Sequence, residues 1–567
     1  MRRPLSIVYG IEDTPPLGVT VLSGLQHVGL ISIFLLFPLL IGREAELPAS
    51  KLLDVLSLSM LTLGVAAILP ALPRGPVGAG FLCPPVFTAA YLGPSFLALK
   101  AGGLPLVFGM TVFAGCVEAT LGRLQRHLRP FFPPEIAGFV VTMLGVTIGA
   151  LGLRYVLGVG VSQPAGSREL AVAAVSLGTM IAFNVWTGGF LRLFCALLGM
   201  IAGYAAAMSV GILTGWDLQR VTGTPLLSVP SVSHLAWSFD ITLAVPFAIG
   251  AMAACLKTIG NVTTCQKMND TDWTRPNMTS IGKGVLADAF GTVTAGLLGT
   301  VGVNSSPSAV GLAGATGVTS RRIAYAIAGL FFILAFMPRA AAVLAIMPPP
   351  VVGATLLFSA CFVLVNGLQI ITSRLLDTRR TFVIGLSFVA GTAVDLFPAS
   401  FTSVPATFQP LVSSSLVLGT VSALLLNLLF RLGVRQTQTL TVAPGRLDLT
   451  TIDEFIKACG AAWGARRDVI ERATFNLTQS VETIVEGCAP EGPLDLEARF
   501  DEFSLDLRVS YAGAPLALPR TRPSNEEIMA TEDGQRKLAG FMLRRSADRV
   551  QSTHGAGRST LVFHFDH

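Results

Sequence analysis

A single lysine inside an apolar stretch is the first residue whose type and position could support binding or chemistry. Lys257 lies in the run ACLKTIGNVTT, within a segment, 251–322, that also contains the Ser/Pro break VNSSPS. A charge at membrane depth is costly unless it has a partner or a function, so it marks a candidate binding site. Pro307 in the break favours the first turn of a new helix, because that turn needs no amide donor from it. A buried cation near a helix start therefore predicts a ligand site at mid-membrane.

Composition places this site in a membrane protein. Of the 567 residues, 52% are hydrophobic and 13% are charged, and the mean hydropathy is +0.65. These values exclude an ordinary soluble globular protein. The net charge of +6 comes from basic residues in short loops between apolar runs, where they set topology. We therefore expect a protein of the lipid membrane that binds no nucleic acid.

Apolar runs long enough to cross a bilayer follow one another through most of the chain. We count fourteen, near 18–42, 50–72, 84–100, 103–121, 135–157, 168–187, 190–213, 242–264, 281–300, 306–319, 323–347, 350–372, 380–397 and 411–432. The third and tenth are short and interrupted by Pro and Gly, at corresponding places in two sets of seven. This predicts an all-α, 7+7 inverted repeat whose two discontinuous spans meet at the midplane. The alternation of basic loops predicts that both termini are cytoplasmic.

Each short span contains a signal for a helix start. In GAGFLCPPVFTAAYLG, an extended piece over Phe81–Cys83 precedes Pro84–Pro85, where we expect the first half-helix to begin. In GVNSSPSAVG, Ser305 or Ser306 is the expected N-cap and proline follows at the first helical position. Both half-helices would direct the positive end of their dipole at the same cavity.

The composition changes near residue 435, which predicts a second domain. We assign 1–435 to the transmembrane domain, 436–445 to a linker and 446–567 to a soluble α/β domain on the cytoplasmic side. Apolar periodicity predicts helices at Ile452–Ala462, Ile470–Cys488 and Gly534–Val550, and strands at Ala498–Val509 and Leu561–Phe565.

No cofactor or metal is expected. The eight cysteines have no CxxC or paired spacing, which supports neither a metal site nor a disulfide framework. Paired carboxylates, a nucleophile triad or a metal-ligand cluster do not appear at a plausible site. The sequence therefore disfavours an enzyme.

The stretch around Lys257 resembles the nucleobase–ascorbate transporter family, which includes uracil and xanthine permeases. KTIGNVTT is similar to the family's eighth helix, GVLADAFGTVTAGLLGT to its ninth and GLAGATGVTSR to the end of its tenth-helix signature. Gln26 and His27 match the family's Gln-His pair in the first span, and PPVVGATLLF matches its twelfth helix. The resemblance implies a core domain of spans 1–4 and 8–11 and a gate domain of spans 5–7 and 12–14. It also implies elevator-like movement and a homodimer.

The resemblance implies the substrate-binding residues as well. They are Lys257 on span 8, Ser308 and Ala309 on span 10, and Ala89 or Ala90 on span 3, together with the Gln-His pair of span 1. An aromatic residue is common in the family at the span 3 position, where this chain has alanine.

At four other positions the chain also departs from the family. Lys257 replaces a glutamate, Asn261 replaces an aspartate, and Ser308–Ala309 replace Glu or Gln followed by Asn. A lysine facing two helix N-termini attracts an anion, so the substrate is interpreted as urate, a xanthine anion or a small anion. In a second reading, Lys257 is neutral or pairs with Asp288 or Glu118, and the substrate is an ordinary base. The third reading is a transport-inactive sensor.

Three residues of the site region have open roles. His27 could relay protons or be a hydrogen-bonded structural residue of a packed helix. Asn261 and Asp288, the latter in a family-like LAD motif, could serve coupling or only brace the helices.

Taken together, these features predict a secondary active transporter, a symporter of the nucleobase type in a bacterial cytoplasmic membrane, coupled to H⁺ or Na⁺. The alternatives are an anion exchanger or carrier of the same fold, and a membrane sensor that signals through the C-terminal domain.

Residues 446–567 resemble the histidine-kinase-like ATPase fold of the anti-sigma-factor type. RATFNLTQSVETIVEGCA is similar to its first conserved helix, and LDLRVSYAGAPL to its strand and nucleotide loop. The positions of the base, the magnesium ligand and the loop hold Gln479, Thr483 and Tyr511–Gly513. Without a carboxylate base or metal ligand, ATP hydrolysis is not expected. A regulatory or dimerising module and a passive appendage remain as alternatives.

Overall fold

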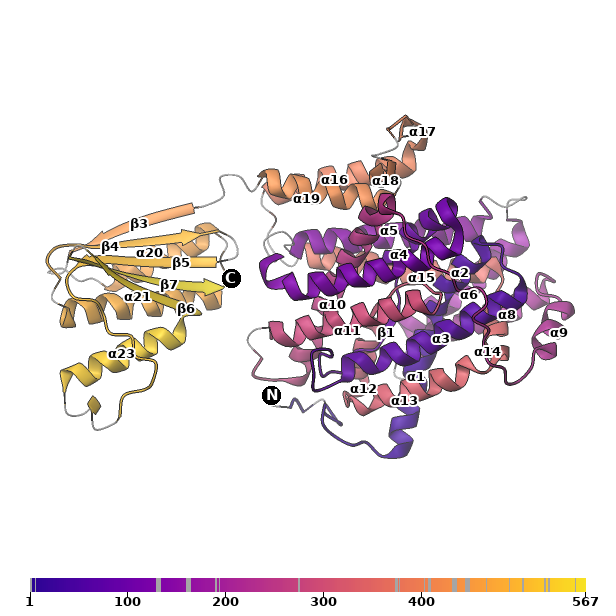
Figure 1. The fold of residues 1–567 in the computed structure, drawn as a ribbon, viewed down its shortest axis with the longest axis horizontal. Coiled ribbons are helices and arrows are strands. Elements are labelled where there is room, and N and C mark those ends of the chain that lie inside the picture. The colour runs from indigo at the N-terminus through magenta and orange to yellow at the C-terminus, as the bar shows by residue number, and fades with distance from the viewer. Residues whose placement is uncertain are drawn as a thin grey trace. The chain divides into compact units, whose positions relative to one another are not determined.

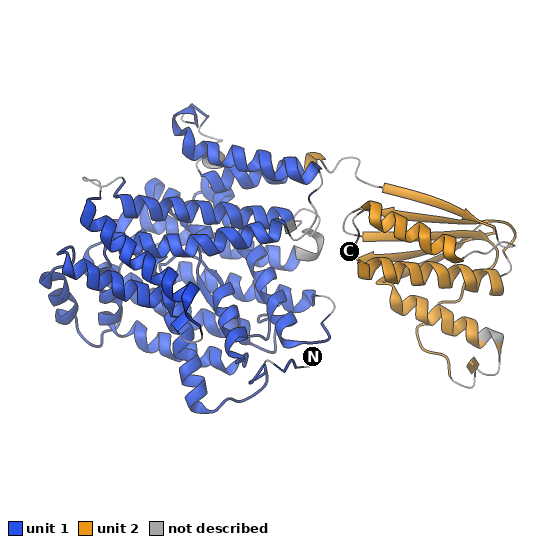
Figure 2. Cartoon of the chain, turned by 180° about the vertical axis from the view of Figure 1, so that it is seen from behind, with its two compact units in different colours: residues 1–427 blue, residues 428–567 orange. Residues whose placement is uncertain are grey.

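A computed structural model shows two compact units, residues 1–427 and 428–567 (Figures 1 and 2). The structure describes residues 3–5, 7–128, 134–159, 165–188, 191–192, 194–273, 276–372, 376, 378–401, 403–405, 409–412, 414–430, 436–443, 449–463, 465, 467–488, 490–501, 504–524, 527–528, 531–555 and 557–566.

The first unit is helical apart from two short strands. Its elements are α1 (Leu17–Ser32), η1 (Ile33–Leu35), α2 (Leu36–Glu44), α3 (Ala49–Ala71), β1 (Pro85–Phe87), η2 (Ala89–Tyr91), α4 (Leu92–Leu128), α5 (Pro134–Leu157), α6 (Ser167–Trp186), α8 (Cys195–Ser209), α9 (Gly215–Gly223), η4 (Ile241–Leu243), α10 (Ala244–Asn269), α11 (Met278–Leu297), β2 (Val303–Ser305), α12 (Pro307–Thr316), α13 (Arg322–Ala335), α14 (Pro338–Ala345), α15 (Pro349–Ile371), α16 (Thr378–Leu396), α17 (Pro398–Phe401), α18 (Gln409–Val412) and α19 (Ser415–Phe430).

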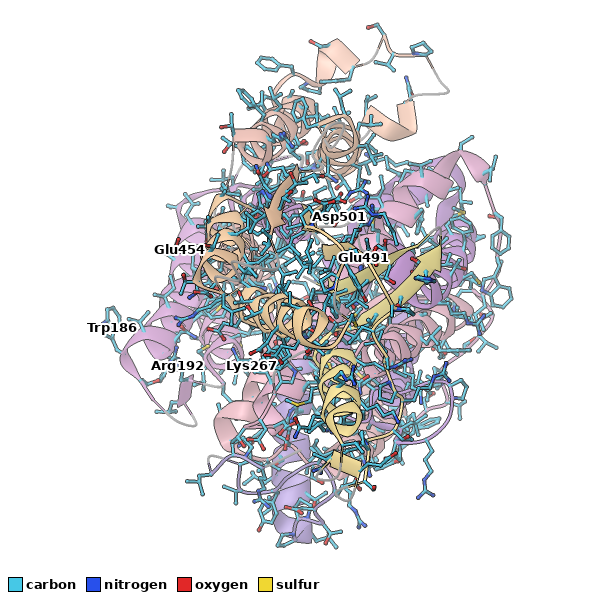
Figure 3. All side chains as sticks on the ribbon, turned by 90° about the vertical axis from the view of Figure 1, so that its left-hand side faces the viewer. Trp186, Arg192, Lys267, Glu454, Glu491 and Asp501 are labelled. Atoms are coloured by element: carbon cyan, nitrogen blue, oxygen red, sulfur yellow. The ribbon has the colours of Figure 1, made fainter. Side chains whose placement is uncertain are left out.

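Several of these helices are membrane spans. Seven helices of the described ranges are long and apolar enough to cross a bilayer, and α13 with α14, bent by 82°, forms an eighth if counted as one span. The expected multi-pass helical membrane protein is thus confirmed, while the count of fourteen stays a prediction. Most of helix α6 is exposed, and Trp186 at its end projects outward with 79% of its surface exposed (Figure 3). An exposed indole at the end of an apolar helix suits the membrane–water interface.

The expected spans 84–100 and 103–121 share helix α4, which contains a kink. The backbone is non-helical at Gly102 and Gly103, and Gly103 has φ of +72°. Glycine adopts this left-handed conformation without the steric penalty of a Cβ. The two glycines therefore separate a half-helix from the span that follows it.

The two discontinuous segments meet in a short two-stranded sheet. Strand β1 pairs antiparallel with β2, with Val86 opposite Asn304. The first half-helix begins at η2 and not at Pro84–Pro85 as expected, because Pro85 opens the strand, a position that tolerates its missing donor. The second follows the prediction, since Ser306 Oγ accepts the Ala309 amide at 3.3 Å and α12 begins at the following proline.

The second unit is an α/β domain. Its elements are β3 (Gln436–Val442), α20 (Leu449–Trp463), α21 (Arg467–Gly487), β4 (Leu494–Phe500), β5 (Ser504–Ala512), α23 (Glu532–Ser546), β6 (Arg549–Gly555) and β7 (Arg558–Asp566). The five strands form one antiparallel sheet in the order β3-β4-β5-β7-β6, and α20 and α21 pack against it. Alternate residues of β4, β5 and β7 are buried in one hydrophobic core. The strand expected at Leu561–Phe565 lies within β7, but the single strand expected over Ala498–Val509 is wrong, because it joins the end of β4 to β5. The helix expected to reach Val550 ends at Ser546, and β6 begins at Arg549.

The prediction of a linker at 436–445 is wrong for most of its length. Residues 436–442 form β3, whose polar edge-strand sequence QTQTLTV gave no apolar alternation along most of its length. Residues 431–435 and 444–448, on either side of β3, lie outside the described residues.

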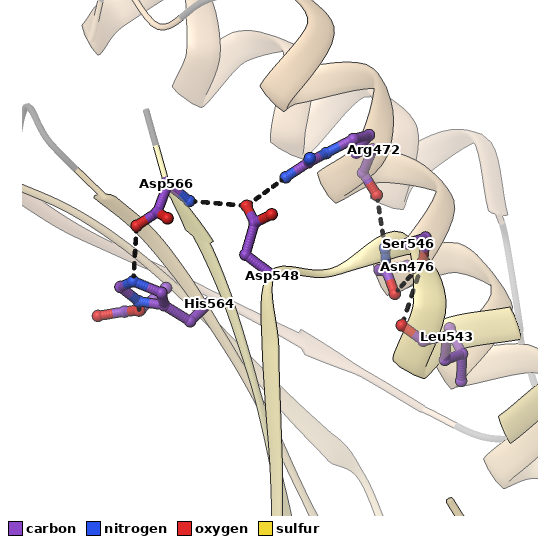
Figure 4. A network of polar contacts seen from close by, with 8 residues as sticks. Arg472, Asn476, Leu543, Ser546, Asp548, His564 and Asp566 are labelled. Atoms are coloured by element: carbon purple, nitrogen blue, oxygen red, sulfur yellow. Dashed lines mark hydrogen bonds and ion pairs between the residues drawn. The ribbon is translucent and has the colours of Figure 1, made fainter. Parts of the chain in front are cut away.

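A polar network joins the helices of this domain to the end of its sheet (Figure 4). Arg472 of α21 forms an ion pair with Asp548 at 2.7 Å, and Asp548 Oδ2 also accepts the Asp566 amide at 3.0 Å. On the same helix, Asn476 Oδ1 accepts from Ser546 Oγ at 2.9 Å. The network ties α21, α23 and β7 together within the domain.

Candidate functional site

Asp288 of α11 anchors the crossing of the two discontinuous segments. Its side chain is 1% exposed, and Oδ2 accepts from Thr258 Oγ1 at 2.5 Å, the Ser305 amide at 2.9 Å and Asn304 Nδ2 at 3.2 Å. Three donors on one carboxylate oxygen hold α10, α11 and β2 together. Of its two open roles, the bracing one thus has a direct structural basis.

Asn261 of α10 also binds to the strand before α12. Its Nδ2 donates to the Ser305 carbonyl at 3.0 Å and to Ser305 Oγ at 2.9 Å, and the residue is 7% exposed. An ionised aspartate has no donor for that carbonyl. The change from aspartate to Asn261 therefore has a structural account that requires no proton transfer.

Lys257 lies one turn before Asn261 on the same helix and is only half-buried. The carboxylate of Asp288 acts electrostatically on its ammonium group. Among the residues that the structure describes, Lys257 has no hydrogen bond or ion pair. The direct pairing with Asp288 or Glu118 considered from the sequence is thus not formed among the described residues. Asp288 Oδ2 instead accepts from three donors, and Glu118 Oε2 accepts from Tyr91.

The α10 surface beside Lys257 opens onto unfilled space. Gly260 is exposed, and a Cβ built on it would meet no atom within 4 Å. Space of this kind next to a lysine suits a ligand better than a packed core does.

The first turn of α12 is accessible too. Ser308 is exposed and its hydroxyl lies 2.9 Å from Ser306 Oγ, whereas Ala309 is fully buried. A Cβ on Gly311, one turn further, also meets nothing within 4 Å. The positive end of the α12 dipole is therefore exposed rather than packed.

The other expected residues frame this turn. Ala89 is half-buried and Ala90 is 1% exposed, with its amide bound to Thr88 Oγ1 at 3.4 Å. His27 of α1 is buried beside the Ala309 backbone, and its Nδ1 lies 2.8 Å from the Ser23 carbonyl, in accord with a structural histidine. Gln26 is half-buried and has no hydrogen bond within the described part of the chain.

Sequence reasoning did not assign several polar residues of this region. Asn304 Nδ2 also donates to the Ala254 carbonyl at 2.9 Å and to Thr258 Oγ1 at 2.7 Å. Asn304 could have been found from the sequence, because it is a polar residue within the break VNSSPS. Tyr91 and Thr258 gave none, since single hydroxyl groups are tolerated throughout apolar spans.

Comparisons with known proteins match most of the first unit to one family. The family model that matches residues 18–399 is that of a permease family, the xanthine and uracil permeases. The xanthine permease XanP of Escherichia coli (strain K12) is 27% identical over 439 residues, covering 75% of this chain and 94% of that protein. The uric acid permease PucJ of Bacillus subtilis (strain 168) is 27% identical over 424 residues, covering 72% and 92%. Among solved structures, the transmembrane domain of the cyanobacterial bicarbonate transporter BicA matches at 15% identity and a TM-score of 0.45, covering 74% of this chain and 99% of that chain.

Proposed function

Because the chain belongs to the nucleobase–ascorbate transporter family of xanthine and uracil permeases, we propose that it carries a purine base in anionic form. The chain is a multi-pass membrane transporter and not an enzyme. The substrates proposed are urate and the xanthine anion, in preference to neutral uracil.

The observation that carries this proposal is that Lys257 has no hydrogen bond or ion pair to any of the residues that the structure describes. Its helix faces open space at Gly260, and the exposed first turn of α12 adds the positive end of a dipole. At an effective dielectric constant of 20, two opposite unit charges 4 Å apart attract by about 4 kcal/mol. Urate is negatively charged at neutral pH and uracil is not, so only urate would gain this attraction.

We further propose that the substrate moves with a rigid core in an elevator mechanism. The core would comprise α1–α4 and α10–α14, and the gate α5–α8 and α15–α19. What supports this is that the hydrogen bonds of Asp288 and Asn261 all run between core elements. We also propose a homodimer in a bacterial cytoplasmic membrane with both termini cytoplasmic.

For the C-terminal unit we propose a regulatory role without ATP hydrolysis. Tyr511 Oη donates to the Ala514 carbonyl at 2.9 Å and accepts the Leu516 amide at 3.0 Å. These bonds close the loop that resembles a nucleotide loop, which favours a structural use of that segment.

Uptake by the purified protein in proteoliposomes tests the proposed substrate. With radiolabelled urate, xanthine and uracil at pH 7, we expect urate uptake to exceed uracil uptake at least tenfold. Xanthine uptake should rise with pH as its anionic fraction grows. Equal uptake of uracil and urate would contradict the anionic substrate.

The alternative functions give different results in the same vesicles. Uptake of bicarbonate or chloride without any purine uptake would identify an anion carrier. Thermal stabilisation by urate without uptake of any compound would identify a sensor.

A further inference from the structure

Glu118 of α4 is a buried acid that the proposed substrate site does not use. Its side chain is 0% exposed, and Oε2 accepts a hydrogen bond from Tyr91 Oη at 3.2 Å. The other oxygen, Oε1, is buried and has no partner within the described residues. The hydroxyl groups of Tyr91 and Thr292 act on this acid, and its unpaired oxygen calls for a functional explanation.

The surroundings of Glu118 contain no compensating cation among the described residues. The titratable groups that face it are Tyr91 of η2, Cys255 of α10 and Asp288 of α11. The charge of Lys257 acts on Asp288. Because an unpaired buried carboxylate costs several kcal/mol, Glu118 holds a proton in this conformation.

Tyr91 connects this proton to the substrate site. It is the last residue of η2 and directly follows Ala89 and Ala90. Its ring is held between two glycines, since a Cβ on Gly302 would lie 2.3 Å from the ring and one on Gly250 would lie 3.0 Å from it. A shift of η2 or β2 around a bound substrate would therefore move the Tyr91 hydroxyl relative to Glu118.

We propose that Glu118 binds the coupling proton of this transporter, and that Tyr91 links its protonation to substrate occupancy. The inference rests on the proposed function and assigns to Glu118 the role of carrying the proton. In each cycle the carboxylate gains one proton, forming an O–H bond, and later releases it on the other side. One proton carried with one urate anion moves no net charge, so transport would respond to a pH gradient and not to membrane voltage.

Proteoliposomes containing the full chain test this inference. A pH gradient of one unit drives at most about tenfold accumulation when one proton accompanies each urate. We expect Glu118→Gln to retain urate exchange at a reduced rate, because its amide oxygen still accepts from Tyr91. Its pH-driven accumulation should disappear, so that the urate concentrations inside and outside the vesicles become equal. The urate-induced pH change reported by entrapped pyranine should disappear as well.

Two further variants separate titration from packing. Thr111→Val removes a buried hydroxyl of α4 that, among the described residues, bonds to the Val107 carbonyl alone, and should leave accumulation and proton flux unchanged. Tyr91→Phe removes the donor to Glu118 and should shift the pH of half-maximal uptake. If Glu118→Gln is not recovered folded, the Tyr91→Phe profile decides: a shifted profile supports the inference and an unshifted one overturns it.

The remaining outcomes are distinct. Accumulation and proton flux that persist in Glu118→Gln would overturn the inference while the proposed function stands. Accumulation that follows a sodium gradient instead of a pH gradient would do the same. Absence of urate and xanthine exchange in the wild-type protein would reject the proposed function, and this inference with it.

Discussion

The carboxylate of Asp288 accepts the backbone amide of Ser305 at 2.9 Å, which joins helix α11 to the strand that precedes half-helix α12. The same oxygen accepts from Thr258 and Asn304. The irregular backbone at membrane depth is thus satisfied by side chains of its neighbours, as the absence of water there requires.

Removal of this acceptor is expected to destabilise the first unit. Asp288→Ala leaves the buried Ser305 amide without this acceptor, at a cost of about 1–3 kcal/mol. We expect a clearly lower melting temperature of the purified protein in detergent. Thr294→Ala on the exposed face of the same helix is the control and should melt like the wild type. An unchanged melting temperature of Asp288→Ala would show that the crossing does not depend on this bond.

Gly302 is expected to be essential for the position of η2. A Cβ there would overlap the Tyr91 ring at 2.3 Å, and both residues are enclosed in the core. Gly302→Ala should reduce urate uptake at least tenfold while Gly329→Ala, with nothing within 4 Å of its Cβ, should not. Uptake is measured at equal protein density in the membrane. Normal uptake by Gly302→Ala would contradict the proposed placement of η2 beside the substrate.

Arg43 is expected to control the rate of transport. Its Nη2 donates to the carbonyls of Ala345 at 2.8 Å and Met347 at 2.7 Å, so it binds the end of α2 to the connection before α15. This connection joins the proposed core and gate. We expect Arg43→Gln to change the maximal urate uptake rate several-fold with little change in KM, and exposed Arg192→Gln (Figure 3) to change neither. A changed KM at an unchanged maximal rate would instead place Arg43 in substrate binding.

The C-terminal domain is expected to lose stability in alkali. His564 Nδ1 lies 2.6 Å from Asp506 Oδ1 and Nε2 lies 3.4 Å from Asp566 Oδ1, and these carboxylates raise the pKa of His564 to about 10. A histidine pKa raised on folding stabilises the fold fully below the unfolded value of about 6.5, and this contribution is lost as pH rises through about 10.

Unfolding of a fragment comprising residues 428–567, followed by circular dichroism between pH 6.5 and 10, measures this effect. The midpoint should fall with rising pH, and His564→Gln should flatten the dependence whereas exposed His554→Gln should not. A wild-type midpoint that is constant over this range would refute the assignment.

Much of the fold was predictable because long apolar runs have one interpretation in a membrane. The start of α12 was predictable as well, since Ser306 and the following proline form a local signal. The start of η2 was not, because Pro85 serves equally well in a strand when β2 is available as a partner. That partner is distant in sequence, so no local pattern reveals it.

The candidate site was predictable only where a charge stood in an apolar run. Lys257 and Asp288 gave that signal, and Glu118 was noticed only as a possible partner of Lys257. In the structure, neither acid pairs with Lys257 among the described residues. Tyr91 donates a hydrogen bond to Glu118, and Thr258 donates one to Asp288. Strand β3 was missed because its exposed edge carries polar residues that resemble a linker.

The ratio of urate to uracil uptake in Lys257→Gln shows whether this lysine selects an anionic substrate. We expect this ratio to fall at least tenfold, equivalent to about 1.4 kcal/mol, because the variant loses the cation and keeps a polar side chain. Lys267→Gln, an exposed lysine on the same helix (Figure 3), should leave the ratio unchanged. An unchanged ratio in Lys257→Gln would contradict the claim that this lysine selects an anionic substrate.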